Sequence, residues 1–235
     1  MTNANDLDVL IIGAGIGGVG AACHLKMNAP EKRFAIWERR TDIGGTWDLF
    51  RYPGIRSDSD MYTLGYTFRP WKEQKAIADG PSILKYIKET AQDGGIDKNI
   101  RYHHKVKNAS WSGETARWTI EIERADSNEM IEMECGFLFM CSGYYNYDEG
   151  FTPKFLGREN FKGQVVHPQK WTSGIDYENK KVVVIGSGAT AVTLVPELAK
   201  TAEKVTMLQR SPTYIMNAPS VDPIARVFRA VLPSK

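Results

Sequence analysis

Two glycine-rich motifs, each directly after a run of apolar residues, constrain the fold more than any other feature of this sequence. The first, Gly13-Ala-Gly-Ile-Gly-Gly18, follows residues 8–12, and the second, Gly186-Ser-Gly-Ala-Thr-Ala191, follows residues 180–185. Continuous apolar runs of this length are typical of strands buried on both faces of a parallel sheet. A strand, a glycine-rich turn and a helix begin the βαβ unit that binds dinucleotides. The sequence therefore predicts an α/β fold with two Rossmann-like dinucleotide-binding units.

The first motif has every part of such a unit. Apolar residues at helical spacing occupy 19–27, a second strand is expected at 34–37, and Glu38 closes that strand. The glycines permit the tight turn, the approach of a pyrophosphate and the packing of helix on strand, while Glu38 can accept hydrogen bonds from a ribose. Because an acid here repels a 2′-phosphate, the site suits FAD or NAD rather than NADP. The alternative is a plain glycine turn before a core helix. The predicted binding residues are Gly13, Gly15, Gly17, Gly18 and Glu38.

The second motif ends differently. Its following strand is expected at 204–208 and is closed by Gln209, Arg210 and Ser211 rather than by an acid. An arginine there accommodates a 2′-phosphate, which favours NADP(H); the alternative is an arginine that is merely exposed at a strand end. Pro196 lies inside the expected helix, so that helix either kinks or is short. The residues predicted to bind NADP are Gly186, Ser187, Gly188, Ala189, Thr190, Ala191, Arg210 and Ser211.

Between the motifs the chain first predicts loops and one helix. Residues 41–58 are too rich in glycine and proline for regular structure and too aromatic for a disordered linker, so an ordered loop is expected. Residues 61–80 give no clear period and predict loop with a short helix. Residues 81–91 begin with proline at a favourable first helical position and should form an amphipathic helix.

A β-meander is expected next. Residues 101–106 alternate like a strand, on which the neighbours His103 and His104 would point to opposite faces and could not share a ligand. Segments 117–124 and 130–134 should form a hairpin, followed by a buried strand at 137–141. No metal site is predicted.

The pattern along the chain also sets the expected domain limits. A first dinucleotide-binding domain is expected at 1–150, a structured linker at 151–178, and a second domain at 179–235. That second domain would be incomplete, because one βαβ unit with a trailing helix is not a finished domain.

Composition excludes several classes of partner. Thirty basic and 28 acidic residues, scattered without long runs, give a net charge of +2 and no footprint for nucleic acid or an anionic membrane. No run approaches the roughly 18 apolar residues of a membrane span, and no signal pattern opens the chain, so the cytoplasm is expected. The three cysteines form no CxxC pair and suggest small buried side chains in a reducing compartment: Cys23, Cys135 and Cys141.

Two further motifs carry a resemblance to a known family. The pattern FxGxxxHxxxW occupies residues 161–171, between the glycine motifs, and the pattern GxWxxxxYPGxxxD occupies residues 45–58. Both resemble fingerprints of the Baeyer-Villiger monooxygenases, class B flavoproteins with an FAD domain and an NADPH domain. Thr172 departs from the longer fingerprint, which usually carries proline or aspartate there. Trp171 favours this branch over the N-oxygenating flavin monooxygenases, which usually lack that tryptophan.

The resemblance implies roles for individual residues. Asp58 would orient an active-site arginine, and His167 and Trp171 would couple NADP binding to domain movement. Trp47 stands where related disulfide reductases carry a redox cysteine, which argues against disulfide reduction. For FAD, the residues implied beyond the first glycine motif are Gly45, Thr46, Trp47, Asp48, Asp58 and Val106. For NADP, those implied beyond the second are Arg56, Ser57 and Asp58.

The chemistry implied by the resemblance uses both nucleotide sites. NADPH reduces FAD, O₂ adds to give a flavin peroxide, and the peroxide attacks a ketone to yield an ester or a sulfur to yield a sulfoxide. The partners would be O₂ and a small ketone, thioether or thioamide. A flavin-dependent reductase, an N-oxygenating monooxygenase and a non-catalytic FAD-binding module are the alternatives. Family members are about twice as long and take their catalytic arginine from the half absent here, so an N-terminal fragment that is inactive alone is expected.

Overall fold

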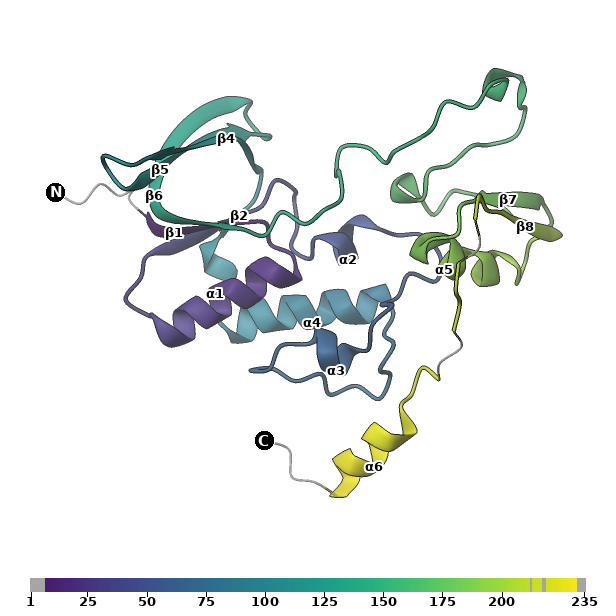
Figure 1. Cartoon of the computed structure of the whole chain (residues 1–235), viewed down its shortest axis with the longest axis horizontal. Helices are drawn as coiled ribbons and strands as arrows, with labels where there is room; N and C mark the ends of the chain where they lie inside the picture. The colour runs from purple at the N-terminus through teal and green to yellow at the C-terminus, as the bar shows by residue number, and fades with distance from the viewer. Residues whose placement is uncertain (1–6, 212, 217–218, 232–235) are drawn as a thin grey trace. The chain divides into compact units, whose positions relative to one another are not determined.

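A computed structural model describes residues 7–211, 213–216 and 219–231 of the chain (Figure 1). Contacts divide it into two compact units. The first unit comprises residues up to Leu49 together with Leu84–Tyr145, and the second comprises Phe50–Ile83 together with residues from Asn146 onward. The domain limits expected from the sequence, 1–150, 151–178 and 179–235, stay a prediction.

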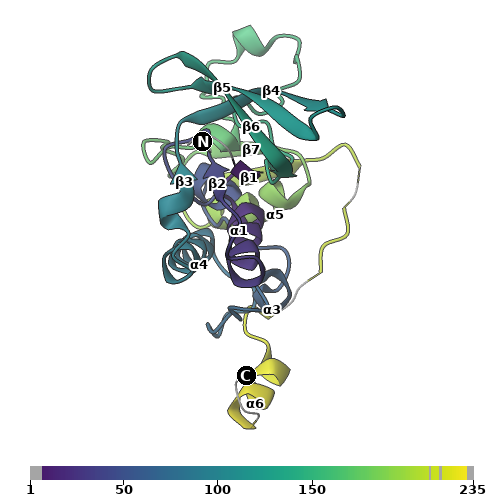
Figure 2. The same cartoon turned by 90° about the vertical axis from the view of Figure 1, so that its left-hand side faces the viewer.

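A six-stranded mixed sheet forms the centre of the first unit. Four strands pair in parallel, and three antiparallel strands, one of them shared, form the predicted meander. Figure 2 shows the meander as a layer on one side of the parallel strands, with helix α1 (Ile16–Asn28) on the other. In order across the sheet the strands are β3 (Ile100–Arg101), β2 (Phe34–Trp37), β1 (Leu7–Ile12), β6 (Glu129–Met140), β5 (Arg117–Arg124) and β4 (His104–Ser112).

The core of the first unit lies between the parallel strands and the meander. Leu10 and Ile12 on β1 and Trp37 on β2 pack against Ile120 and Ile122 on β5. On the other face, α1 packs against the C-terminal end of α4 (Gly80–Asp93), the helix predicted at 81–91, where the Lys26 ammonium donates to the carbonyl of Gly94 at 2.8 Å. This hydrogen bond ties the last turn of α1 to the chain that follows α4.

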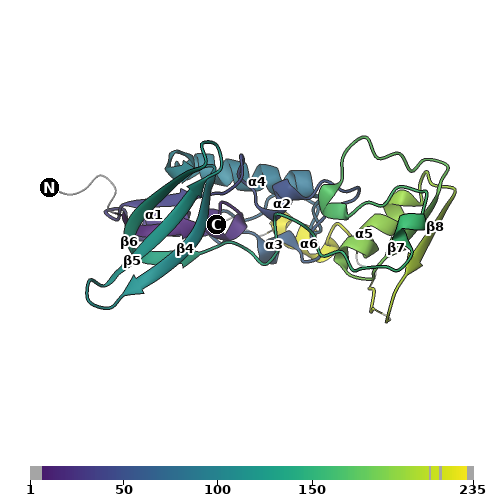
Figure 3. The same cartoon turned by 90° about the horizontal axis from the view of Figure 1, so that it is seen from above.

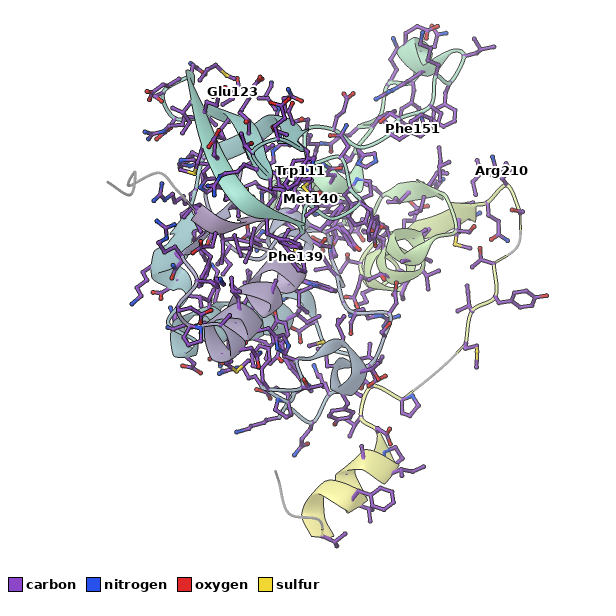
Figure 4. All side chains as sticks on the ribbon, turned by 60° about the vertical axis from the view of Figure 1, so that its left-hand side comes forward. Trp111, Glu123, Phe139, Met140, Phe151 and Arg210 are labelled. Carbon is purple, nitrogen blue, oxygen red and sulfur yellow. The ribbon has the colours of Figure 1, made fainter. Side chains whose placement is uncertain are left out.

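Strand β6 differs from its prediction. Its first half pairs with β5, while Phe137–Met140 pair with β1. The strand expected to be buried at 137–141 instead leaves Phe137 56% and Phe139 44% exposed. The reason is that, among the described residues, this half of β6 pairs on one side only. Figure 4 shows Phe139 and Met140 near its end.

The strand expected at 101–106 is interrupted. His103 takes a left-handed conformation (φ 62°) between β3 and β4, and its amide donates to the carbonyl of Arg40 at 3.2 Å. The two histidines therefore do not alternate along one strand: His104 opens β4, and its ring lies 5.5 Å from that of Trp37. In the described part of the chain, no three His, Cys, Asp or Glu residues gather where a metal ion could bind.

The second unit contains a parallel β-α-β arrangement. Figure 3 shows β7 and β8 side by side with α5 along them. Both strands alternate between half-buried and exposed residues rather than being buried throughout, since the described residues add no third strand to this sheet. Helix α5 continues through Pro196 to Leu198, so the proline lies in its last turn. The elements are α3 (Met61–Leu64), β7 (Lys181–Ile185), α5 (Ala189–Leu198), β8 (Lys204–Leu208) and α6 (Pro223–Val231).

Within the described part of the chain no cysteine forms a disulfide: Cys23 and Cys135 are buried, and Cys141 is half-buried. The segment at 75–77 pairs with the chain at 220–221, where the Ala76 amide donates to the carbonyl of Ser220 at 2.7 Å. Among the described helices, none combines the length and the apolar character that crossing a bilayer demands.

Candidate dinucleotide sites

The first glycine turn has a geometry that only glycine permits. Gly13 has φ +100°, and a Cβ added to it would lie 2.5 Å from the carbonyl oxygen of Cys141. A Cβ on Gly18 would lie 1.8 Å from the carbonyl oxygen of Gly13, whereas one on Gly17 would make an ordinary contact of 3.8 Å with Cys141. Gly15 is the N-cap of α1, which has no side-chain cap and no acid in its first turn. Such a helix end favours an anionic group.

Glu38 lies directly beside this turn. Its side chain is buried, and one carboxylate oxygen accepts the amide of Ala14 at 2.9 Å while the other accepts the amide of Arg40 at 3.0 Å. A carboxylate has about four lone-pair sites, so acceptor capacity is left for a ribose. The structure thus brings the predicted acid to the predicted glycines.

A short loop meets the same turn. The amide of Gly44 donates to the carbonyl of Ala14 at 2.9 Å, and a Cβ on Gly15 would lie 3.6 Å from the Cα of Gly45. The loop continues into a single helical turn, α2 (Thr46–Leu49), whose Asp48 is buried. The loop therefore contacts the glycine turn at Gly44 and Gly45. The other residues predicted from the resemblance come directly after this contact along the chain: Thr46, Trp47 and Asp48.

Val106 is placed less directly. It is half-buried on β4 against the core of the first unit and pairs with Ile122. Two residues earlier, the amide of His104 donates to the carbonyl of Glu38 at 2.9 Å. The strand that carries Val106 is therefore tied to the predicted ribose-binding acid through His104.

The second glycine turn repeats this design in the second unit. Gly186 has φ +129°, and its amide donates to the carbonyl of Leu208 at 2.8 Å. Gly188 is the N-cap of α5, again with no side-chain cap and no acid in the first turn. Among the described residues, none lies within 4 Å of a Cβ added to Gly186 or Gly188. The side chains therefore leave open space in front of this helix end.

The end of β8 supplies the charge predicted for this site. Arg210 is exposed, and within the described part of the chain no carboxylate forms an ion pair with it; Figure 4 shows its side chain beyond the end of β8. The hydroxyl of Ser187 lies 3.5 Å from the carbonyl of Ser211, and it accepts the hydroxyl of Thr213 at 3.0 Å. The turn and the strand end are thus linked, with the guanidinium available to a ligand.

Tyr52 and Gly54 lie against α5. Burial raises the pKa of the Tyr52 phenol, the side-chain hydrogen bond with Thr190 lowers it in part, and the charge of Asp58 raises it further, so the pKa is raised overall. Gly54 has φ +76°, and a Cβ there would lie 2.3 Å from Cγ of Glu197. Sequence reasoning missed the role of Tyr52 as an anchor, because its partner is remote in the chain.

The residues expected at the nicotinamide follow this anchor. Ser57 is buried, and its hydroxyl accepts the amide of Ala78 at 3.1 Å. Arg56 and Asp58 on either side are exposed, and Arg56 forms a backbone bridge with Asp79. The alternation leaves the two charged side chains accessible while the serine holds the loop in place.

The motif at 161–171 ends in a compact turn. His167 caps the 3₁₀ turn Pro168–Lys170, its Nδ1 accepting the amide of Gln169 at 3.2 Å. A Cβ on Gly150 would lie 1.9 Å from the His167 ring, so this glycine gives the imidazole its space. Trp171 follows and packs edge-on against Tyr177, with 5.9 Å between ring centroids. The structure brings His167 and Trp171 to the two ends of one turn.

The two units separate the predicted residues by cofactor. Apart from Asp58, every residue predicted for FAD lies in the first unit, and every residue predicted for NADP lies in the second. The motif at 45–58 is divided between Leu49 and Phe50, so its two parts belong to different units.

Comparison with known proteins gives one family and many relatives. The FMO-like model, flavin-binding monooxygenase-like, matches residues 7–224. The FAD-containing monooxygenase EthA of Mycobacterium tuberculosis H37Rv is 59% identical over 228 residues, which are 97% of this chain and 46% of that protein. The probable FAD-binding monooxygenase AlmA of Acinetobacter baylyi is 51% identical over 228 residues, again 97% of this chain and 46% of that protein. The chain thus spans about half the length of the curated relatives it matches.

Solved structures agree with the fold. An oxidised steroid monooxygenase bound to NADP superposes with a TM-score of 0.80 at 30% identity, covering 95% of this chain and 42% of that one. The protein OTEMO in complex with FAD and NADP gives a TM-score of 0.75 at 30% identity, covering 88% of this chain and 39% of that one. Cyclohexanone monooxygenase from Rhodococcus, at 23% identity and a TM-score of 0.78 over 97% of this chain and 43% of that one, supports the fold alone.

Proposed function

The chain belongs to the flavin-binding monooxygenase-like family, and on that premise we propose that it binds FAD at the first glycine turn and NADP(H) at the second. The observation that carries the proposal is the opposite charge beside two similar turns: the carboxylate of Glu38 at one and the guanidinium of Arg210 at the other. A carboxylate suits a ribose hydroxyl pair and an arginine suits a 2′-phosphate. The relatives named for FAD, and the solved relatives bound to NADP, support both assignments.

The residues of the first unit fit FAD. The α1 N-terminus can hold the pyrophosphate, because no side chain caps it and Gly13, Gly15 and Gly18 keep the turn clear. Glu38 would accept the ribose hydroxyls, Gly45–Asp48 would lie along the flavin, and Val106 would contact the adenine. When bound, FAD and NADPH together supply the electrons that a monooxygenase delivers to O₂.

The residues of the second unit fit NADP(H). The open space before Gly186 and Gly188 leaves room for a pyrophosphate at the α5 N-terminus, and Arg210 with Ser211 would bind the 2′-phosphate. Arg56, Ser57 and Asp58 would border the nicotinamide. His167 and Trp171 would respond to NADP binding through the turn that they enclose.

For the reaction, we infer oxygen insertion of the Baeyer-Villiger type into ketones, or oxygenation of a thioether or thioamide sulfur. The motifs at 45–58 and 161–171 support this assignment. The assignment applies to a whole protein as long as the relatives, in which Asp58 would orient an active-site arginine. The test is to incubate this chain with FAD, NADPH and a ketone or thioether, and to measure ester, sulfoxide and NADPH oxidation; by itself the chain should form no product.

A titration tests the nucleotide assignment directly. Wild-type chain should bind FAD, measured by quenching of flavin fluorescence, and should bind NADP⁺ more tightly than NAD⁺, measured by calorimetry. Arg210→Ala should weaken NADP⁺ binding by about 10- to 100-fold, because charged hydrogen bonds to a phosphate are lost, and should leave NAD⁺ binding unchanged. Lys204→Ala, which removes the same charge at the other end of β8, is the control. Equal loss of both nucleotides in Arg210→Ala would contradict a 2′-phosphate site.

A further inference from the structure

We propose that Arg40 is a positioning residue of the FAD site, an assignment that rests on the proposed function of the first glycine turn. No sequence motif points to this arginine. In the structure it joins three segments that carry predicted FAD residues: the end of β2 with Glu38, the loop at 44–48, and the turn at 102–104 that leads to Val106.

The side chain of Arg40 holds the loop. One guanidinium nitrogen lies 2.6 Å from Oδ2 of Asp48, and the other donates to the carbonyl of Gly45 at 3.3 Å. The side chains of Arg40 and Asp48 are only 21% and 7% exposed. A buried carboxylate left without its partner is strongly unfavourable, so this pair fixes the turn Thr46–Leu49.

The backbone of Arg40 holds the other two segments. Its amide donates to Oε1 of Glu38 at 3.0 Å, which orients the carboxylate toward Ala14. Its carbonyl accepts the amide of His103 at 3.2 Å, which sets the start of β4. Substitution of the Arg40 side chain leaves these backbone hydrogen bonds possible. It removes only the side-chain contacts with Gly45 and Asp48.

The loop held in this way lies against the glycine turn. Gly44 donates to the carbonyl of Ala14, and Gly45 lies over Gly15, within 3.6 Å of an added Cβ. A ligand on the α1 N-terminus would therefore meet Gly45–Asp48 in one fixed conformation only while Arg40 is bound to Asp48. Asp48 then acts through Arg40: its carboxylate orders the loop, and the flavin would meet the backbone.

Arginine is needed rather than any cation. The planar guanidinium reaches a carboxylate and a carbonyl at once, whereas a lysine ammonium is a point charge on a flexible chain. Arg40→Lys should keep the ion pair with Asp48 and weaken the hold on Gly45. An intermediate effect of lysine therefore distinguishes positioning from a general loss of charge.

The experiment compares Arg40→Met, Arg40→Lys and wild type in the 235-residue chain. Arg124→Met is the matched control, because Arg124 forms a two-point pair with Asp126 in the same unit, on the β5–β6 hairpin rather than on the loop at 44–48. FAD binding is measured by fluorescence quenching and by the visible absorption of the bound flavin. Amide hydrogen exchange at 47–49 is measured without FAD, and thermal melting checks folding.

Arg40→Met should weaken FAD binding on the order of 10-fold or more, the loss of a charged hydrogen-bond pair. It should also alter the absorption of the bound flavin and speed exchange at 47–49. Arg40→Lys should lie between, and Arg124→Met should match wild type. Wild-type FAD affinity, or unchanged exchange, in Arg40→Met would overturn the assignment of Arg40. Failure of wild type to bind FAD would overturn the proposed FAD site itself.

Discussion

The two glycine turns share one backbone design and differ in what surrounds it. Gly13 and Gly186 each donate to the last residue of the following strand, at 2.7 and 2.8 Å. The N-caps of α1 and α5 have nearly the same angles, φ −81° and ψ −171° for Gly15 against −79° and −177° for Gly188. The backbone therefore offers the same phosphate end in both units, and neighbouring side chains must distinguish the nucleotides.

The surroundings differ in packing as well as charge. In the first unit, the third motif position is Gly18, which has no room for a methyl group, and the acid after β2 is buried and bonded to the turn. In the second unit, that position is Ala191, and the arginine after β8 is exposed. The first turn is thus packed against its own strand and bonded to a buried acid, while the second has, among the described residues, an open space and an arginine without an ion-pair partner.

The largest expected effect comes from Gly18→Ala, which gives the first turn the alanine that the second turn has at the third motif position. The new Cβ would lie 1.8 Å from the carbonyl oxygen of Gly13, with backbone rather than a flexible side chain in the way. Overpacking of this kind should lower the free energy of unfolding by about 3 kcal/mol, measured by urea denaturation. Gly17→Ala, one residue earlier in the same helix, has room at 3.8 Å and should be neutral or slightly stabilising. Equal stability of the two variants would contradict the difference between the turns.

A smaller effect is expected where a loop is anchored to the second turn. Tyr52→Phe removes the hydrogen bond to Thr190 and should lower stability by about 1 kcal/mol. Thr190→Val should cost the same, and the double variant no more, because both remove one interaction. Thr190→Ser keeps the hydroxyl and should behave as wild type. Additive losses in the double variant would show that the two side chains act independently.

The same tyrosine predicts a pH dependence. Burial raises the pKa of Tyr52, the hydrogen bond with Thr190 lowers it in part, and the charge of Asp58 raises it further; the pKa is raised overall, so the folded state holds this proton more tightly than the unfolded state. The stability that it contributes is fully present below about pH 10, the ordinary pKa of tyrosine, and is lost as pH rises through the folded value. The stability difference between wild type and Tyr52→Phe should therefore shrink above about pH 10. A constant difference would argue against a perturbed phenol.

Local sequence predicts the glycine turns well because their chemistry is contiguous. The strand, the turn, the helix and Glu38 lie within one stretch, and the structure brings them together as expected. The same stretch does not reveal Arg40, because its partners Asp48 and His103 are chosen by the fold. The binding residues themselves stay predictions.

Contacts remote in sequence explain the errors in the fold. The strand expected at 101–106 breaks because His103 bonds to Arg40, which no pattern in the strand encodes. The apolar run at 137–141 predicts a buried strand. The exposure of its side chains depends on which elements cover β6, and the hydrophobic pattern of the strand does not contain that information. Tyr52 and Thr190 meet only after the chain has passed through Leu84–Tyr145 of the first unit and returned to the second.

The smallest expected effect compares one ion pair from each unit. In the first unit, Lys88 on α4 lies 2.8 Å from Asp42; burial alone would raise the pKa of Asp42, but the Lys88 hydrogen bond and the Ile43 amide lower it overall. The pair's stability is present above about pH 4 and is lost as pH falls through the folded pKa. Asp42→Asn should cost about 0.5 kcal/mol at neutral pH, because the pair is partly exposed, and the difference should vanish in acid.

Asp176 of the second unit provides the comparison for this pair. Its carboxylate bonds to Lys180 at 2.5 Å within one loop and is fully exposed, so Asp176→Asn should produce no measurable change in stability at any pH. Urea denaturation of both variants at neutral and acidic pH measures the contrast. A larger loss of stability from Asp176→Asn than from Asp42→Asn would contradict this expectation. It would mean that the second unit depends more on its surface charges than on its packing.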